Sequence, residues 1–296
     1  MATLILTRRD VTELLQMREV LEAMERVSQD YAEGKAAMPP KAYVSLTKGD
    51  FRAMPACTSG AVGLKWVNVH PQNPIQGLPT VMATLIYSDP DTGYPLAVMD
   101  ATEITAYRTG ATAAIAAKYL ARRDSHILGL IGLGRQAYTQ LLAHAELFDL
   151  NLIRVYDRSP EAIRRFISAF SERRVEACPV EQVAASDIVC TLTPSREPLL
   201  KREWLRPGAY INAIGADAEG KQELDPSILR EVMVVVDDMT QASQSGEINV
   251  PLRKGEFTRE QVYGTLGEIV AGRKPGRTDD ETITAVSYTH LTLPTN

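Results

Sequence analysis

The pattern of apolar and polar positions differs between the two halves of the chain. In the first half, five short apolar segments are separated by turn residues, which predicts successive strands. They are AYVSLT (42–47), FRAMPA (51–56), AVGLKWVNV (61–69), TVMATLIYS (80–88) and PLAVMD (95–100). The last two are joined by Asp89-Pro90-Asp91-Thr92-Gly93, whose residue types favour a turn. Strands in succession with tight turns predict an antiparallel sheet.

Helical patterns border these strands on both sides. Asp10 and Glu13 have the spacing of a capping box, and apolar residues at positions 20, 24, 27 and 31 mark one face of a helix that ends near Gly34. An alanine-rich segment at 101–121 predicts a long helix that leads into the second half of the chain.

Strands and helices alternate from residue 125 onward. Near-continuous apolar segments at 127–131, 187–193, 209–215 and 232–238 predict buried strands. Ser159-Pro160 and Asp225-Pro226 are typical helix starts. This alternation predicts a parallel sheet covered by helices on both faces, a doubly wound α/β fold.

The length of 296 residues favours two domains over one. We expect a first domain at 1–118 and a doubly wound domain at 119–286. After Glu281 the sequence becomes TITAVSYTHLTLPTN, which is rich in threonine and has no helical pattern. We therefore interpret residues 287–296 as a non-native tail and exclude them from the expected fold.

Composition narrows the class of protein. The chain is 45% apolar and 23% charged with a net charge of −5, which gives no electrostatic reason to expect nucleic acid or an anionic membrane as partner. No apolar run approaches the length of a membrane span, and the N-terminus lacks a signal-peptide pattern. The three cysteines are far apart and the four histidines form no cluster, so we expect neither a disulfide framework nor a metal site. The expected location is the cytoplasm.

The segment Ser125–Ser159 has the order of a dinucleotide-binding unit: strand, glycine turn, helix, strand, acid. Gly132 permits the tight turn, Gly134 lets the backbone approach a pyrophosphate, and Ala137 is the small residue where the helix meets the strand. Between them, Arg135 and Gln136 begin the helix, whose free N–H groups and partial positive charge favour phosphate.

Asp157 ends the second strand of this unit. Its carboxylate would accept hydrogen bonds from the adenosine ribose hydroxyls, which favours NAD over NADP. Arg158 beside it can tolerate a 2′-phosphate, so the use of NADP stays open. The alternative interpretation is a glycine turn in an α/β protein that binds no nucleotide.

Four basic residues of the first half are candidates for binding a substrate carboxylate: Lys41, Arg52, Lys65 and Arg108. Lys65 lies in an apolar strand, where an ammonium is costly unless it meets an anion or reaches water. The alternative for each is an ordinary surface cation.

Asp217 follows the predicted strand 209–215, and Thr193 follows the predicted strand before it. Open α/β sheets place their ligands at the carboxyl ends of such strands. The Asp217 carboxylate could therefore take protons from an amine or water, and Thr193 could line the nicotinamide pocket. The alternative for Asp217 is a turn-forming residue.

The motifs FRAMPA, GLKWVN, PLAVMDATEITAYRTGA, GLGRQA, TPSREP, PGAYINAIGADAEGKQELD and SGEIN, in this order, resemble the ornithine cyclodeaminase/mu-crystallin family over residues 1–285. The resemblance implies an N-terminal α+β domain that binds substrate and dimerises through a shared sheet. It also implies a Rossmann domain that binds NAD(H) or NADP(H).

Site residues follow from the same resemblance. It implies substrate binding by Lys41, Lys65 and Arg108, and cofactor contacts at the motif positions Thr109, Gly132, Gly134, Asp157 and Thr193. Asp217 matches the catalytic acid/base of the cyclodeaminases, a position that mu-crystallin fills with a non-acidic residue.

Two departures from the family pattern matter. Where the cyclodeaminases carry a glutamate suited to the second amine of ornithine, this chain has Arg52, which would repel that amine and favours a small neutral side chain or an extra carboxylate. The family also continues into a final helix that packs on the first domain, which the unusual tail replaces here.

We therefore expect an NAD(H)-dependent dehydrogenase or imine reductase of small 2-amino acids, in the alanine dehydrogenase-like branch and acting as a homodimer. Lys41, Arg52 and Arg108 would hold the carboxylate, with Lys65 at the carboxylate or imine region. Asp217 would accept the amine proton and activate water as hydride passes from Cα to the cofactor. The alternatives are an ornithine cyclodeaminase that recycles NAD, and a non-catalytic NAD(P)H-binding protein resembling mu-crystallin.

Overall fold

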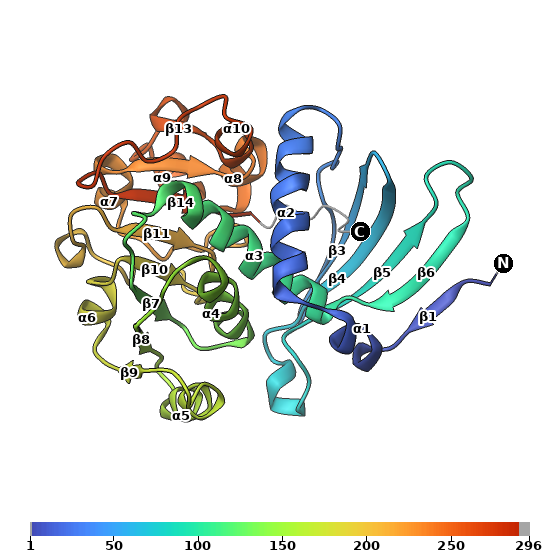
Figure 1. The fold of residues 1–296 in the computed structure, drawn as a ribbon, viewed down its shortest axis with the longest axis horizontal. Coiled ribbons are helices and arrows are strands. Elements are labelled where there is room, and N and C mark those ends of the chain that lie inside the picture. The colour runs from blue at the N-terminus through green and yellow to red at the C-terminus, as the bar shows by residue number, and fades with distance from the viewer. Residues whose placement is uncertain (1, 290–296) are drawn as a thin grey trace. The chain divides into compact units, whose positions relative to one another are not determined.

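The computed structural model describes residues 2–289, shown as a ribbon in Figure 1. These residues form two compact units, and the division lies between Arg108 and Thr109. It falls inside the long helix α3 (Thr102–Leu120), whereas the sequence analysis placed the domain boundary at the end of that helix. Within the described range, no helix is both long enough and apolar enough to cross a bilayer.

The first unit contains a six-stranded sheet in the order β1-β6-β5-β4-β3-β2. Its strands are β1 (Leu4–Leu6), β2 (Ala42–Leu46), β3 (Gly49–Thr58), β4 (Ala61–Val69), β5 (Val81–Ser88) and β6 (Pro95–Asp100). β2 to β6 pair antiparallel, as predicted, and the three-residue β1 adds a parallel strand beside β6 that the sequence analysis did not foresee.

Helices α1 (Arg8–Leu14) and α2 (Met17–Ala32) precede these strands, and a short 3-10 turn, η1 (Asn73–Gln76), follows β4. The predicted capping box has a different register: Thr7 is the N-cap of α1, and Asp10 is the third helical residue that bonds back to it. The predicted helix between positions 20 and 31 is confirmed as part of α2, and Gly34 follows its end with φ of +75°.

The second unit contains an eight-stranded sheet in the order β13-β12-β14-β11-β10-β7-β8-β9, in which every pairing is parallel. Its strands are β7 (Ile127–Ile131), β8 (Leu152–Tyr156), β9 (Val175–Ala177), β10 (Ile188–Thr191), β11 (Tyr210–Ala213), β12 (Met233–Val236), β13 (Val262–Thr265) and β14 (Thr284–Ser287). The predicted doubly wound α/β class is confirmed.

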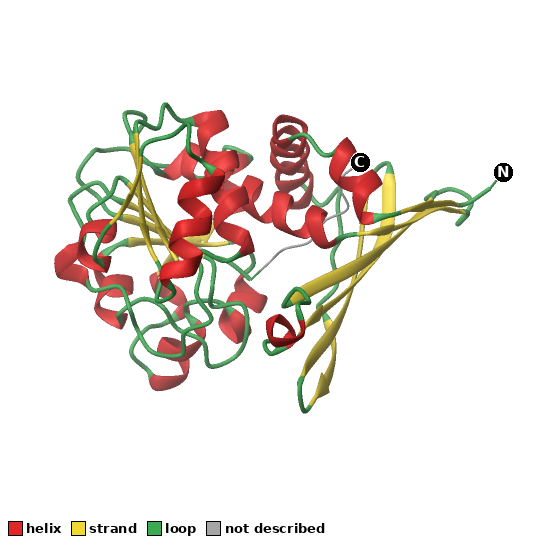
Figure 2. Cartoon of the chain, turned by 90° about the horizontal axis from the view of Figure 1, so that it is seen from below, coloured by secondary structure: helices red, strands yellow, loops and turns green. Residues whose placement is uncertain are grey.

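Helices connect these strands and cover the sheet on both faces (Figure 2). They are α4 (Arg135–Leu147), α5 (Pro160–Ala169), α6 (Val180–Ala184), α7 (Pro226–Glu231), α8 (Met239–Ser245), α9 (Asn249–Lys254) and α10 (Leu266–Val270), with 3-10 turns η2 (Arg202–Trp204) and η3 (Arg259–Gln261). Alternate strand residues enter different cores: Ile188 and Cys190 pack in one cluster, and Val189 packs in the other. Burial on both faces explains why these strands are continuously apolar.

β14 was not expected from the sequence, in which no element was predicted after residue 282, yet it lies between β11 and β12 with all four residues buried. The expected tail boundary at residue 287 falls on the last residue of this strand. Tyr288 and Thr289, which follow, are also buried. The rest of the expected tail, 290–296, lies outside the described residues, and its origin stays a prediction.

Candidate functional site

The glycine turn after β7 has the geometry that a dinucleotide needs. Gly132 has φ of +96°, and an added Cβ would lie 3.0 Å from Thr193 Cγ2, so any side chain there would be strained. Gly134 is the N-cap of α4, and an added Cβ would meet nothing within 4 Å, so the space beside its backbone is open. Arg135 and Gln136 begin α4, and Ala137 is fully buried where that helix meets the sheet.

Asp157 lies just beyond the end of β8 and is bound to the glycine turn. Its Oδ2 accepts a hydrogen bond from the backbone N–H of Leu133 at 2.7 Å, and its Oδ1 accepts one from Ser159 at 2.8 Å. The carboxylate is therefore held in one orientation at the edge of the sheet.

A cavity of about 800 Å³ opens at the carboxyl ends of β7, β8 and β10. Five of the predicted cofactor residues line it, namely Gly132, Gly134, Asp157, Arg158 and Thr193. A glycine turn, an open helix N-terminus and an acid at one cavity fit a dinucleotide. Thr109, predicted as a further cofactor contact, is a buried residue of α3.

Glu223, which the sequence analysis missed, organises the strand ends beside this cavity. Its carboxylate accepts hydrogen bonds from the N–H and hydroxyl of Thr193, both at 2.7 Å, from the hydroxyl of Thr191 at 2.7 Å and from the N–H of Gly215 at 2.8 Å. The side chain is fully buried, and burial raises the pKa of its carboxyl group while the hydrogen bonds oppose that rise. Glu223 lies in the family motif PGAYINAIGADAEGKQELD, but its role could not be derived from the sequence, because its partners lie at the ends of two different strands.

Asp217 is half-buried in the loop after β11. Its backbone N–H bonds to Gly215, and its Oδ1 accepts a hydrogen bond from the Lys221 ammonium. Lys221 is four residues further on, and its side chain is 18% exposed. An adjacent cation favours the ionised carboxylate, the form that can accept a proton.

The predicted substrate cations belong to the first unit. Arg52 and Lys65 are buried on β3 and β4, and Arg108 is buried on α3. Lys65 is two residues from Val67, the direct partner of Arg52, so both side chains project from the same face of the sheet.

The cations are close enough to affect one another. Burial lowers the pKa of the Lys65 ammonium well below its ordinary value, and the charges of Arg108, Lys41 and Arg52 lower it further. Such a cluster of buried positive charge favours an anionic ligand.

Arg52 has a carboxylate partner of its own. Its Nε donates to Asp50 Oδ1 at 2.6 Å and its Nη2 donates to Asp50 Oδ2 at 3.2 Å, while the guanidinium lies 5.4 Å from the centre of the Tyr43 ring. Asp50 and Tyr43 thus fix the plane of the guanidinium. The arginine was predicted from the sequence, whereas its contacts with Asp50 and Tyr43 were not.

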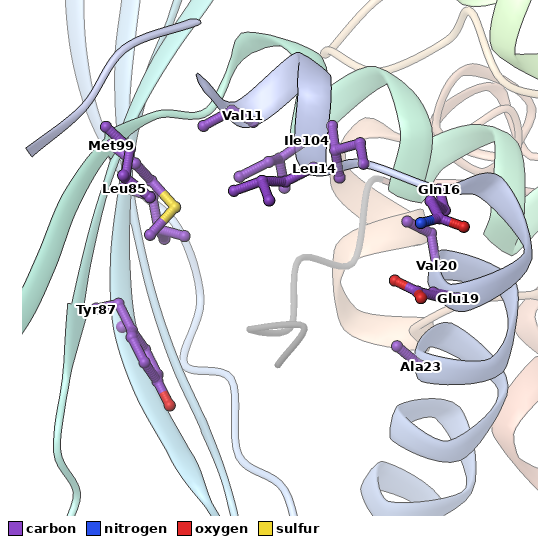
Figure 3. Close-up of a pocket in the computed structure, with 13 residues that line it drawn as sticks. Val11, Leu14, Gln16, Glu19, Val20, Ala23, Leu85, Tyr87, Met99 and Ile104 are labelled. Carbon is purple, nitrogen blue, oxygen red and sulfur yellow. The ribbon is translucent and has the colours of Figure 1, made fainter. Parts of the chain in front are cut away.

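A second cavity, of about 340 Å³, lies within the first unit (Figure 3). Leu85, Tyr87 and Met99 of the sheet line one side, and residues of α2 line the other. Leu85 pairs with Lys65, so this cavity opens on the sheet face that carries the cations. None of the predicted site residues lines it.

Residues 2–289 contain no group of three or more histidine, cysteine or acidic side chains that could hold a metal ion. The three cysteines are free, and burial raises the pKa of the Cys190 thiol to about 12.

Comparison with known proteins gives consistent matches over the whole chain. The sequence profile of the ornithine cyclodeaminase/mu-crystallin family matches residues 1–293. Alanine dehydrogenase of Archaeoglobus fulgidus is 51% identical over 295 residues, which cover 99% of this chain and 92% of that protein.

Solved structures agree with the sequence matches. An archaeal alanine dehydrogenase dimer with bound NAD superposes with a TM-score of 0.95 at 50% identity, covering 98% of this chain and 91% of that one. The Δ1-pyrroline-2-carboxylate reductase of Thermococcus litoralis, in complex with NADH and L-proline, superposes with a TM-score of 0.93 at 36% identity and covers 96% and 91% of the two chains.

Proposed function

The chain belongs to the ornithine cyclodeaminase/mu-crystallin family, and we propose that it is an NAD(H)-dependent oxidoreductase of small 2-amino acids. It would oxidatively deaminate the amino acid, or in reverse reductively aminate a 2-oxo acid or reduce a ketimine. The observation that carries this proposal is the cavity lined by Gly132, Gly134 and Asp157, in a chain half identical to an alanine dehydrogenase.

The second unit supplies the cofactor site. The turn at Gly132 and Gly134 and the start of α4 would receive the pyrophosphate, Asp157 the ribose hydroxyls, and Thr193 the wall beside the nicotinamide. When bound, NAD(H) exchanges a hydride with the substrate carbon, and the protein supplies orientation and proton transfer.

The first unit supplies the anion site. Lys41, Arg52 and Arg108 would bind the substrate carboxylate, and Lys65 would contact the carboxylate or the imine region. Arg52 is held in place by Asp50, so its guanidinium is oriented before substrate arrives. Positive charge at this position disfavours a substrate with a second amine, which supports an amino acid with a small side chain over ornithine.

Asp217 would act as the acid/base. Lys221 favours its ionised form, so the carboxylate can take a proton from the substrate amine. Once that proton has passed to solvent, the carboxylate would take a second one from the water that attacks the imine and return it to the nitrogen that leaves as ammonia. The presence of this acid supports catalysis over mere nucleotide binding.

We also propose that the active form is a cytoplasmic homodimer. Both edge strands of the first sheet expose apolar side chains: Leu4 and Ile5 on β1, and Tyr43, Val44 and Leu46 on β2. Exposed edges of this kind favour pairing with another chain. Sedimentation analysis of the purified protein tests the dimer.

The test of function is the absorbance of NADH at 340 nm with ammonia and a panel of 2-oxo acids, including pyruvate. A cyclic ketimine and methylamine are tested in parallel reactions. Ornithine with NAD is assayed separately for the release of ammonia. We expect NADH oxidation by a small 2-oxo acid or a ketimine, abolished in Asp217→Asn, which retains NADH binding. Release of ammonia from ornithine without net NADH formation would instead identify a cyclodeaminase. Nucleotide binding with no turnover would favour the non-catalytic alternative.

A further inference from the structure

Glu223 has no role in the chemistry proposed above, yet its buried carboxylate accepts four hydrogen bonds at the strand ends of the second sheet. Each carboxylate oxygen receives one backbone N–H and one threonine hydroxyl. Oε1 binds both donors of Thr193, and Oε2 binds the hydroxyl of Thr191 and the N–H of Gly215. One side chain therefore joins the end of β10 to the end of β11.

The two groups joined in this way serve different parts of the proposed site. Thr193 lines the cofactor cavity, and Gly215 accepts a hydrogen bond from the N–H of Asp217 at 2.9 Å. The backbone is closely packed here, because a Cβ on Gly215 would lie 2.1 Å from the Thr193 carbonyl oxygen and 2.6 Å from Glu223 Oε2. A shift of the Glu223 carboxylate would move both the cavity wall and the start of the Asp217 loop.

The hydrogen bonds favour the charged form of Glu223, whereas burial raises the pKa of its carboxyl group. Two of the four partners are backbone N–H groups, which can only donate, and the other two are threonine hydroxyls. None of these four partners carries a charge. A buried carboxylate without a cation is costly unless hydrogen bonds compensate for the lost water, and the four donors do so here. Because all four bind one carboxylate, they also hold it in one orientation.

A second buried carboxylate lies directly behind this group. Glu247 accepts hydrogen bonds from the backbone N–H of Glu223 at 2.9 Å and from that of Leu224 at 2.7 Å. It is fully buried like Glu223 but bonds to neither Thr193 nor Gly215. Glu247 is therefore a matched control for the loss of a buried carboxylate.

We propose that Glu223 is a positioning residue for the reaction: by holding Thr193 and Gly215 together, it fixes the cofactor wall relative to the Asp217 loop. The proposal rests on the function proposed above. It assigns Glu223 an action through its two partners rather than on the substrate.

The diagnostic variant is Glu223→Gln, because it preserves size but offers one oxygen and an NH2 group to four donors. We expect the dissociation constant for NADH, measured by fluorescence, to rise about tenfold, and kcat to fall about a hundredfold. We expect Tm to fall by a comparable amount in Glu223→Gln and in Glu247→Gln. In Glu247→Gln, however, the dissociation constant for NADH and kcat should each change less than threefold.

If Glu223→Gln stays within twofold of wild type in both quantities, the proposal is wrong. Equal losses in the two variants would also overturn it, because they would indicate general destabilisation. Should Glu223→Gln fail to fold, Thr191→Val removes one donor from Oε2 within the core, and kcat must then fall three- to tenfold for the proposal to stand.

The proposed function can fail independently of this inference. If wild-type protein binds NADH but turns over no substrate, the function is wrong, and the NADH dissociation constants of the two glutamate variants still decide the role of Glu223.

Discussion

The carboxylate of Asp157 accepts a hydrogen bond from the backbone N–H of Leu133, which joins the acid after β8 to the glycine turn after β7. The acid and the turn therefore form one rigid group rather than two separate contacts. The backbone N–H of Ser159 donates a hydrogen bond to the other oxygen of Asp157, so the carboxylate presents a fixed negative charge at the cavity edge.

That charge predicts the choice between the two nicotinamide cofactors. In Asp157→Ser we expect NADH to bind about tenfold more weakly, a loss of about 1.4 kcal/mol, and NADPH to bind more tightly because repulsion of its 2′-phosphate is removed. Arg158→Ala is the control, in which NADPH should gain nothing. Fluorescence titration measures the affinity of each variant and of the wild type for NADH and for NADPH. If the ratio of the two affinities in Asp157→Ser is the same as in the wild type, Asp157 does not bind the adenosine ribose.

The two glycines of the turn predict opposite effects. Gly132→Ala must place a Cβ at φ of +96° and 3.0 Å from Thr193, so we expect a loss of about 1–3 kcal/mol in the free energy of unfolding. Gly134→Ala has room for its methyl group, so stability should stay within about 0.5 kcal/mol while NADH affinity falls, because the methyl group occupies the approach of the pyrophosphate. Urea unfolding and NADH titration separate the two outcomes. Equal stability losses in both variants would show that this account of the turn is wrong.

Arg52 predicts substrate preference. Arg52→Gln removes the cation held by Asp50, and we expect kcat/KM for a small 2-amino acid to fall tenfold or more through KM, while NADH affinity stays unchanged. Steady-state kinetics with alanine and ornithine measure the effect. If alanine turnover is insensitive to this change, Arg52 does not bind the substrate carboxylate.

We expect Lys65 to be required for activity without contributing to the free energy of unfolding. Burial and neighbouring cations disfavour its charged form, so Lys65→Met should leave the free energy of unfolding unchanged or raise it by up to about 2 kcal/mol, while activity is lost. Urea unfolding of both proteins at pH 7 tests this. A clear fall in stability would mean that Lys65 helps to hold the first unit together.

His144 predicts a dependence of stability on pH. It is fully buried on α4, with Nδ1 2.8 Å from the Gln140 carbonyl oxygen and Nε2 3.2 Å from Asn212 Nδ2, and burial lowers its pKa to about 4. Because the unfolded chain binds this proton near pH 6.5 and the folded one does not, stability should fall as the pH drops from 6.5 towards 4. The loss is on the order of 3 kcal/mol. NMR titration should show one imidazole still neutral at pH 5.

The sequence predicted elements whose signal is local. The glycine turn, the five antiparallel strands and α2 are each encoded in a short window, and all are confirmed. The family was also recognised correctly, because its motifs retain their order along the chain. The roles of the individual site residues remain predictions.

Features that depend on distant residues were missed. β14 is a short segment that begins with threonine, and only its neighbours β11 and β12 make it a buried strand. The role of Glu223 likewise depends on hydrogen-bond donors at the ends of two strands, β10 and β11. One of them, Thr193, is 30 residues from Glu223 in the sequence. The capping box of α1 was displaced by three residues, because Thr7 as well as Asp10 can serve as an N-cap.

The position of β14 has a consequence for synthesis on the ribosome. β12 and β13 can pair with each other as they emerge, but β14 separates them from β11, so they cannot join the rest of the sheet until residues 284–287 have been translated. Until then the edges of β11 and β12 expose unpaired backbone groups and apolar surface. The nascent chain should therefore depend on chaperones until β14 has emerged, and destabilising changes in β14 should reduce the yield of folded protein more than changes in the edge strand β9.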